Sequence, residues 1–401
     1  MTTPARMTST FDTMWAELEP IGRSADGGYH RFAWTAEDAA LREWFAAEAA
    51  RRGMSCVVDR AGNQWAWWGD PDADGPGVVT GSHLDSVPGG GAFDGPLGVV
   101  SAFAAVDLLR EQGWTPSRPI GIAAFADEEG ARFGVACTGS RLLTGALPVE
   151  RALALTDADG VTLAEAVTRA GSDAASLGPD AEALRRVATF VELHVEQGRG
   201  LIHLDRPVGV ASGIWPHGRW RVTLTGAANH AGTTPLDERR DPMLDLATLI
   251  QVARQAAAQH GALATVGKVE VTPNGVNAIP SQVRAWLDCR AREEAAVHAV
   301  VSELAGFTPT GESWTPPTVF DAALAARVAA AAGEPDAPAP LLDTGAGHDA
   351  GIFHAAGIPT AMLFVRNPTG ISHAPAEFAE RDDCLAGVRA LAATLANLTS
   401  K

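Results

Sequence analysis

The sequence predicts an α/β fold with a mostly parallel sheet, into which a smaller α+β domain is inserted. The first half of the chain and its C-terminal part alternate short apolar runs with helical patterns, as strands buried on both faces of a parallel sheet do. Between these parts, strands alternate apolar and polar residues with a period of two, which is typical of half-exposed strands. The length of 401 residues also exceeds what one hydrophobic core usually supports.

The larger domain is expected to contain four buried strands and a long helix. The strands follow from apolar runs bounded by glycine or proline, and the helix from an apolar pattern of helical length. Open α/β sheets build their sites beyond the carboxyl ends of such strands. The expected strands are 77–82, 120–125, 190–195 and 359–365, and the expected helix is 97–110.

The inserted domain is expected over residues 212–324, which leaves 1–211 and 325–401 as one discontinuous domain. Proline at position 242 suits the first turn of a helix, and the order of elements is the split β-α-β-β-α-β motif of a small α+β layer. The expected elements are strand 219–225, helix 242–260, strands 264–271 and 283–290, and helix 294–304.

Charge and cysteine content exclude several classes of protein. Lys and Arg number 31 against 48 Asp and Glu, a formal charge of −17, and a nucleic-acid partner would require a basic surface. The longest apolar run, 97–106, is too short to cross a bilayer, and the N-terminal segment lacks the apolar core of a signal peptide. The four cysteines form no CxxC pair, so neither a disulfide framework nor a zinc ribbon is expected. A cytoplasmic enzyme without a membrane partner fits these observations.

The first candidate site is the segment GSHLDSVPGGGAFDG, which follows the first expected strand. His83 and Asp85 come directly after that strand, and a His-x-Asp pair lets the carboxylate fix the tautomer of a metal-binding imidazole. The glycines then allow a tight turn that brings Asp94 back toward the same point. Taken alone, the segment is equally compatible with a glycine-rich loop that holds an incidental histidine.

The second candidate is the acidic run 127–129, which follows the expected strand 120–125. Such runs are usually solvated loops in an acidic chain. At a strand end, however, adjacent carboxylates can have different roles, because one can bind a metal while the other transfers protons. The position of the run therefore makes it a candidate for catalysis.

Two further candidates carry histidine. Period-two alternation places Glu192, His194 and Glu196 on one face of an otherwise apolar strand, where polar side chains need partners. His373 lies in a loop after the last expected strand, and on its own it is typical of a surface histidine.

Together these segments offer nitrogen and carboxylate ligands without a thiolate. Such donors suit Zn²⁺, Mn²⁺ or Co²⁺ and disfavour an iron–sulfur cluster or a structural thiolate site. Because one catalytic zinc takes three protein ligands, five ligands predict a two-metal site with ions about 3.5–4 Å apart. The expected ligands are His83, Asp94, one glutamate of the 128–129 pair, His194 and His373.

A series of short motifs runs from about residue 20 to the C-terminus in the order of a known family. These motifs are GSHLDSVP, GGAFDGPLGV, ADEEGARFG, ELHVEQG, NHAGTTP, NAIPSQV, CR, GAGHDA and SHAPAE. In this series the chain resembles the amidase/hydantoinase/carbamoylase branch of the M20 metallopeptidases. That branch contains allantoate amidohydrolases, N-carbamoyl-L-amino acid hydrolases and bacterial β-ureidopropionases.

The resemblance implies a dimetal-hydrolase catalytic domain with an inserted lid and dimerisation domain. In the family pattern Asp94 would bridge two divalent metals, and His83 and His194 would each bind one of them. Glu129 would be a ligand on the side of His83, whereas His373 would join His194.

The resemblance also assigns catalytic and carboxylate-binding side chains. Glu128 would take a proton from the attacking water, and Asp85 would orient the first metal-binding histidine. His230, which alone is typical of a surface histidine, would reach the partner subunit's active site and polarise the scissile carbonyl. Asn277 and Arg290 would hold the substrate carboxylate, which a guanidinium can grip bidentately. Because these three residues would act across an interface, a homodimer is implied.

The expected reaction is hydrolysis of a linear ureido or carbamoyl C–N bond in a small carboxylate-bearing substrate. Gln197 is expected beside the metals, and His217, Gly347 and His348 are weaker candidates for contact with the substrate. The polar and aromatic segment 214–220 favours allantoate, which has extra hydrogen-bonding groups. N-carbamoyl-L-amino acids and β-ureidopropionate are alternatives, because they also carry a carboxylate beside the ureido group.

Other classes of protein fit the sequence less well. Residues 345–350 match the loose GxGxxA form of a Rossmann-type oxidoreductase, but no acidic residue follows at the distance that binds a ribose. The chain contains no GxSxG elbow of a serine hydrolase. A non-catalytic binding protein would be expected to lack a metal ligand or Glu128, and none is missing.

Overall fold

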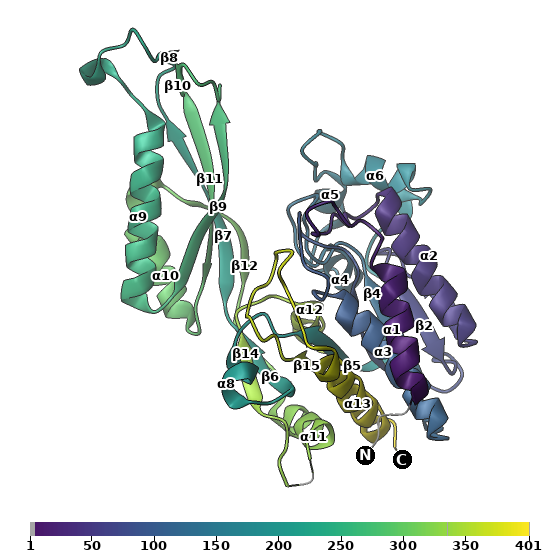
Figure 1. The fold of residues 1–401 in the computed structure, drawn as a ribbon. Helices are drawn as coiled ribbons and strands as arrows, with labels where there is room; N and C mark the ends of the chain where they lie inside the picture. Colours follow the sequence, from purple (N-terminus) through teal and green to yellow (C-terminus); the bar gives the residue numbers. More distant parts are fainter. Residues whose placement is uncertain (1–4, 335, 401) are drawn as a thin grey trace. The chain divides into compact units, whose positions relative to one another are not determined.

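The computed structural model describes residues 5–334 and 336–400, which form two compact units (Figure 1). The sequence assigns residues 343–347 to the larger domain, whereas in the structure they cluster with the smaller unit. Unit 1 comprises the described residues up to Ser212, Phe320–Leu342 and the chain from His348 onward, and unit 2 comprises Gly213–Val319 and Asp343–Gly347.

The larger sheet has nine strands in the order β1-β2-β4-β3-β5-β15-β6-β13, with β14 beside β6. The four central strands, β4, β3, β5 and β15, are parallel, whereas β1, β2, β6 and β13 pair antiparallel. The α/β fold is therefore confirmed, with four adjacent parallel strands at the centre of the sheet. The strands are β1 Ser55–Val58, β2 Gln64–Trp68, β3 Gly77–His83, β4 Ile120–Phe125, β5 Val187–Val195, β6 Val208–Ile214, β13 Thr318–Val319, β14 Leu341–Thr344 and β15 Thr360–Val365.

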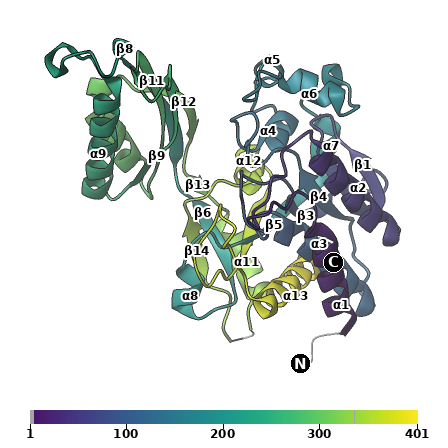
Figure 2. The ribbon, with the colours of Figure 1, turned by 45° about the horizontal axis from the view of Figure 1, so that its top comes forward.

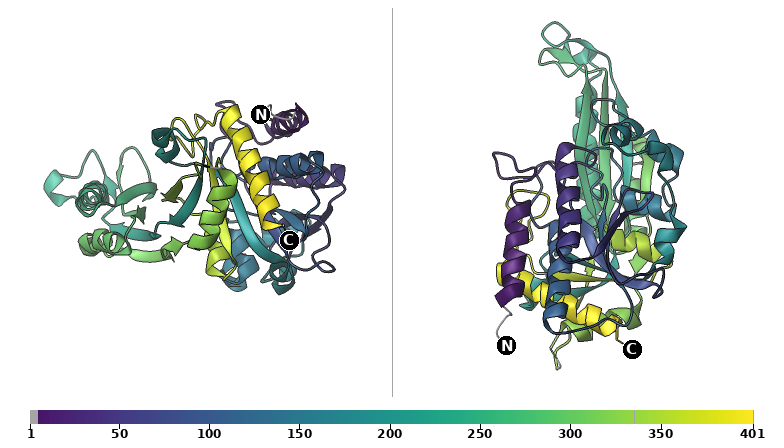
Figure 3. Two further views of the ribbon diagram at one scale, coloured as in Figure 1. Left: turned by 90° about the horizontal axis from the view of Figure 1, so that it is seen from below. Right: turned by 90° about the vertical axis from the view of Figure 1, so that its right-hand side faces the viewer.

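Helices cover both faces of this sheet (Figures 2 and 3). Helices α1, α2, α3, α11 and α13 bury the main core on one face, and α12 with α4 beside it packs on the other face. Among the described residues, no helix is long and apolar enough to cross a membrane. The helices are α1 Ala5–Leu18, α2 Ala36–Arg51, α3 Pro96–Glu111, α4 Thr138–Thr144, α5 Val149–Leu153, α6 Leu163–Arg169, α7 Ala181–Arg185, α8 Gly200–Leu204, α11 Ala322–Ala332, α12 Asp349–Ala355 and α13 Arg381–Leu398.

Unit 2 is a four-stranded antiparallel sheet in the order β12-β7-β11-β9, and α9 and α10 pack against it over a separate core. The expected β-α-β-β-α-β order is present, and the short strands β8 and β10, which pair with each other in a separate sheet, are added to it. The elements are β7 His217–Thr225, β8 Asn229–His230, α9 Pro242–His260, β9 Leu263–Thr272, β10 Ala278–Ile279, β11 Gln282–Arg290, α10 Glu294–Glu303 and β12 Thr310–Thr315.

Local chemistry explains why the bounds of α9 were readable from the sequence. The Asp241 side chain caps the helix by accepting the Met243 N–H, and Pro242 occupies the first turn. Gly261 adopts the left-handed conformation that ends the helix. The expected range 242–260 is therefore confirmed.

Candidate metal centre and active site

The candidate residues meet where the central parallel strands end. His83 is the last residue of β3, and His194 is the penultimate residue of β5. Glu128 follows β4, Asp94 precedes α3, and His373 lies in the loop after β15. Because the carboxyl ends of parallel strands meet at one edge of the sheet, side chains from distant parts of the chain converge there.

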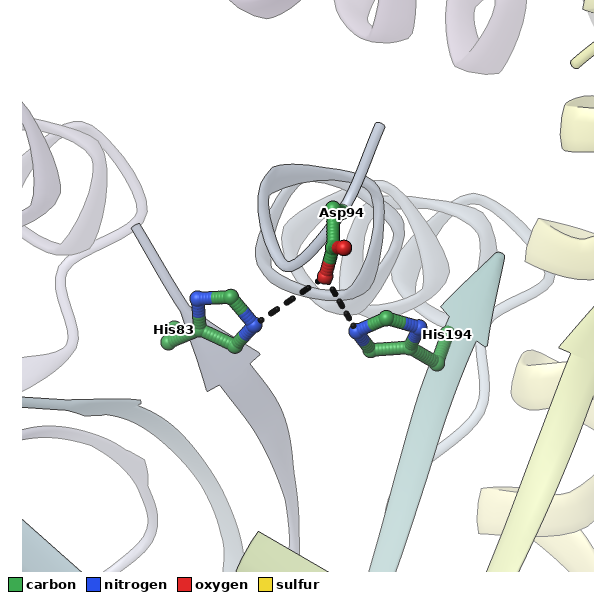
Figure 4. A group of neighbouring side chains, drawn as sticks. All are labelled: His83, Asp94 and His194. Atoms are coloured by element: carbon green, nitrogen blue, oxygen red, sulfur yellow. Dashed lines mark ion pairs between the residues drawn. The ribbon is translucent and has the colours of Figure 1, made fainter. Parts of the chain in front are cut away.

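The first donor group consists of two buried histidines and one aspartate (Figure 4). His194 Nε2 lies 3.1 Å from Asp94 Oδ1, and His83 Nε2 lies 3.5 Å from the same oxygen. The two rings stack with centroids 5.8 Å apart. These three side chains could hold a single ion between them.

The second donor group shares Asp94 with the first and adds Glu129 and His373. His373 Nε2 lies 3.3 Å from Asp94 Oδ2 and 3.6 Å from Glu129 Oε2. Each oxygen of Asp94 therefore faces one group, as a bridging carboxylate would.

The pairing of the ligands differs from the one that the resemblance implied. His83 was expected to share a metal with Glu129, and His194 with His373, but the structure groups His83 with His194 and Glu129 with His373. The physical reason is the order of the sheet. Strands β3 and β5 are neighbours, so they present both histidines side by side, and this order cannot be read from the sequence.

The donor set fits a divalent metal. His83 Nδ1 lies 3.1 Å from the Asp85 carbonyl oxygen, and His194 Nδ1 lies 2.9 Å from that of Val195. A carbonyl oxygen accepts only, so Nδ1 carries a proton in both rings, and the Nε2 of each neutral ring can offer its lone pair to an ion beside Asp94. His194 Nε2 is buried and makes no hydrogen bond. Burial opposes the charged form of His194, but its contact with Asp94 outweighs burial and raises its pKa, so without an ion this Nε2 takes up a proton. A metal ion would take the place of that proton.

The carboxylates of the site are buried close together. Burial and the charge of Asp94 raise the pKa of Glu129 to about 7. Burial raises the pKa of Glu128 well above its usual range, and the charges of Asp349 and Glu129 add to this effect. Burial and the charge of Glu192 raise the pKa of Asp349 to about 8. In such a pocket the ionised carboxylates repel one another and are poorly solvated, so bound cations would stabilise them.

Asp85 does more than orient a histidine. Its carboxylate oxygens accept the backbone N–H groups of Glu128 at 3.1 Å and Glu129 at 3.0 Å. Oδ1 also lies 3.5 Å from His83 Nδ1. One buried carboxylate therefore fixes His83, Glu128 and Glu129 relative to one another.

Glu377 holds Asp94 in a way that the sequence did not reveal. Its Oε1 accepts the N–H groups of Phe93 at 3.0 Å and Asp94 at 2.9 Å, and its Oε2 accepts the Ser372 hydroxyl at 3.0 Å. The signal was present in the SHAPAE motif, but this contact depends on segments that are far apart in the sequence. Gln197, expected beside the metals, donates to Asp94 Oδ2 at 2.8 Å.

The two glutamates that were expected on the same face as His194 have structural partners; Glu192 lies in β5, and Glu196 directly follows it. Glu192 accepts the Ser82 hydroxyl at 2.8 Å and the Ala350 N–H at 2.9 Å. Glu196 accepts the Leu201 N–H at 3.0 Å at the start of α8. Of these three polar residues, His194 is therefore a candidate ligand, whereas the two glutamates accept hydrogen bonds from neighbouring segments.

His348 belongs to unit 1 and lies against the donor residues. Its ring centroid is 4.5 Å from that of His194, and its side chain is buried. Together with Glu192 and His194 it forms a further group of possible ligand atoms. The structure therefore places His348 beside the first donor group.

The remaining candidates for substrate contact belong to unit 2. His230 forms part of β8 and pairs with Ala278 of β10, and the Ala231 N–H donates to the Asn277 carbonyl at 2.9 Å. The side chains of His230 and Asn277 are exposed. These two residues therefore lie close together at the short β8–β10 pair.

Arg290 ends β11 opposite His217 of β7. Asp288 accepts from Arg290 Nε at 2.6 Å and from Nη2 at 2.9 Å, and the Gly345 carbonyl accepts from Nη1 at 2.8 Å. Two of the five guanidinium N–H groups, one on each terminal nitrogen, therefore stay available for a carboxylate. Gly347 lies beside His217, since a β-carbon there would be 3.3 Å from His217 Nε2.

Comparison with known proteins identifies the family. The family described as Peptidase family M20/M25/M40 matches residues 79–397. The chain is 37% identical to the N-carbamoyl-L-amino acid amidohydrolase of Geobacillus stearothermophilus, over 94% of each chain. It is 31% identical to the allantoate amidohydrolase of Escherichia coli (strain K12), over 95% of each. The crystal structure of AtUAH in complex with glyoxylate matches with a TM-score of 0.90 and 28% identity, over 98% of this chain and 97% of that one.

These matches confirm the resemblance that the motifs carried, including its extent along the chain. The chain belongs to peptidase family M20/M25/M40 and is a metal-dependent hydrolase of carbon–nitrogen bonds.

Proposed function

We propose that the chain hydrolyses the ureido or carbamoyl C–N bond of a small carboxylate-bearing substrate. The observation that carries this proposal is the geometry around Asp94, whose two oxygens face two donor groups. The Glu128 carboxylate lies next to the first donor group, with its Oε2 3.8 Å from His83 Nε2. His83 and His194 would hold one ion, Glu129 and His373 the other, with Asp94 between them.

The chemistry of the reaction divides among a few side chains. Two divalent ions, when bound, lower the pKa of water and polarise an amide carbonyl. Glu128 takes the proton of the attacking water and passes it to the leaving nitrogen. His230 stabilises the negative charge that develops on the carbonyl oxygen. Arg290 and Asn277 hold the substrate carboxylate, and Arg290 is already oriented by Asp288.

The metals we propose are Zn²⁺, Mn²⁺ or Co²⁺, because the donors are imidazoles and carboxylates. Mass spectrometry of the gently purified protein identifies the ions and should find about two per chain. We also propose a cytoplasmic location. The four cysteines are all free thiols, which is typical of a reducing compartment.

We propose that the protein is a homodimer formed through unit 2, which acts as a lid over the substrate. Strand β9 lies at one edge of its sheet and exposes Leu263 and Val269, while α9 exposes Leu244 and Ile250. An unpaired edge strand beside exposed apolar residues is a template for pairing with a second copy. A two-fold axis would then let His230 of one subunit serve the metals of the other.

Mixing two inactive variants tests this arrangement. Glu128→Gln and His230→Ala homodimers should each be inactive, because each lacks one essential group at both sites. If His230 acts across the interface, a heterodimer has one complete site, so subunit exchange should restore about a quarter of wild-type activity. A mixture that exchanges subunits, shown by native mass spectrometry, and stays inactive would contradict the shared site.

Two substrates have specific support. Allantoate is favoured by the polar surroundings of Arg290, where His217 lies opposite in β7 and Arg292 lies over the Trp215 ring at 5.2 Å. N-carbamoyl-L-amino acids are favoured by the higher identity with the Geobacillus enzyme. Both carry the carboxylate that Arg290 would bind.

An ammonia-release assay separates these substrates. The metal-loaded protein should release ammonia from at least one of allantoate, N-carbamoyl-L-amino acids and β-ureidopropionate. Because Arg290 would bind their carboxylate, the amide of the preferred substrate should show a kcat/KM lower by about 100-fold. Turnover of none of the three acids, with both ions present, would exclude the proposed function.

A further inference from the structure

The side chain of Glu128, the base of the proposed reaction, touches a buried thiol. Cys137 Sγ donates a hydrogen bond to Glu128 Oε1 at 3.2 Å, while the other oxygen, Oε2, faces His83 Nε2 at 3.8 Å. Both residues are buried. One oxygen of the carboxylate is therefore occupied by the thiol, and the other is directed toward a metal-binding histidine.

The backbone brings this thiol to the carboxylate. The Cys137 N–H donates to the Glu128 carbonyl at 2.6 Å, and the Thr138 N–H donates to the Asp127 carbonyl at 3.0 Å. Cys137 has a φ of 55°, in the left-handed region that is unfavourable for any residue with a β-carbon. Strain of this kind persists where surrounding contacts enforce it, and it gathers at functional sites.

The other charged neighbours of the Glu128 carboxylate lie farther from it than the thiol or repel it, so they hold its orientation less firmly. The terminal torsion of a glutamate is broad, so the carboxylate rotates unless a partner holds it. Asp349 lies in the same buried group, in which ligand atoms of Glu128, Cys137 and Asp349 are within 4.8 Å of one another. A second carboxylate repels the first, whereas the thiol offers it a donor.

We propose that Cys137 is a positioning residue, whose thiol holds the Glu128 carboxylate so that Oε2 faces the reacting water. This inference rests on the proposed function, because it assigns Glu128 the role of base. A thiol suits this task because it is a weak donor. It fixes the direction of the carboxylate, while a hydroxyl or N–H donor would stabilise the anion more strongly and make it a poorer base.

Steady-state kinetics of the metal-loaded protein test the proposal. Cys137→Ala should lower kcat about tenfold, with KM and metal content unchanged, because only the direction of the base is lost. Cys137→Ser keeps a donor that fixes the carboxylate, but its hydroxyl is a stronger donor than the thiol, so it should recover only part of this loss. The matched control is Cys384→Ala in α13, which removes another buried thiol and should leave kcat unchanged. If Cys137 only fills space, its alanine variant lowers Tm while kcat stays at the wild-type value, and the proposal is wrong.

Infrared spectroscopy tests the contact without relying on turnover. The S–H stretching band of Cys137, found as the difference between wild type and Cys137→Ser, should move to higher frequency in Glu128→Gln, because an amide oxygen accepts more weakly than a carboxylate. An unmoved band would overturn the proposal even if the alanine variant failed to fold. Wild-type protein that hydrolyses no ureido acid would instead contradict the proposed function, and the band would still report on the contact.

Discussion

Replacing Glu128 by glutamine should reduce kcat by about 1,000-fold or more while leaving both metals in place. The amide keeps the shape of the side chain but cannot accept the proton of the attacking water. Glu128 belongs to neither of the two donor groups that share Asp94, so its charge is not needed to hold the ions. Single-turnover kinetics and metal analysis of the same preparation check both parts of this prediction.

A matched control separates the loss of a base from the loss of a buried charge. Glu48 is a buried glutamate of α2 that pairs with Arg52, so Glu48→Gln removes a buried carboxylate away from the candidate centre. Its kcat should equal that of the wild type, although its Tm should fall. Retained turnover in Glu128→Gln would refute the assignment of the base, and a loss of metal would make Glu128 a ligand instead.

The elements that the sequence predicted well are those whose signals are local. Helix α9 has its cap, its proline and its terminal glycine within the segment itself. Strands β3 and β4 are buried along their whole length, so they appear as continuous apolar runs. The edge strands β1 and β13 gave no such signal, because β1 is exposed along its length and β13 has two residues. Their pairing depends on neighbours that are distant in sequence.

The candidate site was readable for a similar reason. His83, Glu128 and His194 follow or end apolar strands, and parallel strands bring such residues to one edge of the sheet. Which of the candidate ligands could share an ion depends on the order of the strands in the sheet, and this order cannot be inferred from the amino-acid sequence. The contacts of Glu377 with Asp94 and of Cys137 with Glu128 join loops whose approach is a property of the whole fold.

Removing the metals with a chelator should abolish turnover and leave a protein whose stability falls as the pH rises. The reason lies in the buried carboxyls. Burial and neighbouring charges raise the pKa of Glu129 to about 7 and that of Asp349 to about 8, whereas in the unfolded chain such groups lose their protons near pH 4. Between these values the folded state binds more protons than the unfolded state, so the free energy of unfolding decreases with pH.

His373 adds to this effect with the same sign. Burial opposes its charged form, but the hydrogen bond to Asp94 and the charge of Glu129 outweigh burial and raise its pKa to about 9. The stability that it contributes is present below its ordinary pKa of about 6.5 and is lost as the pH rises through 9. Asp94 acts in the opposite direction, because contacts with three histidines outweigh its burial and lower its pKa well below the usual range. Its contribution changes only in acid.

Calorimetry from pH 6 to pH 9 measures the outcome. The Tm of the metal-free protein should fall by about 5 °C or more across this range, whereas the metal-loaded protein should change little, because the ions offset the charge that deprotonation exposes. Asp349→Asn should flatten the metal-free curve, since it removes one of the groups that titrate in this window. If Tm changed equally with pH in the metal-free and the metal-loaded protein, the carboxyls of Glu129 and Asp349 would not lie beside the ions. Because acids and histidines alike lose protons over the same interval, the gap between the curves should widen steadily with pH, as expected of a site built to exchange protons for metal.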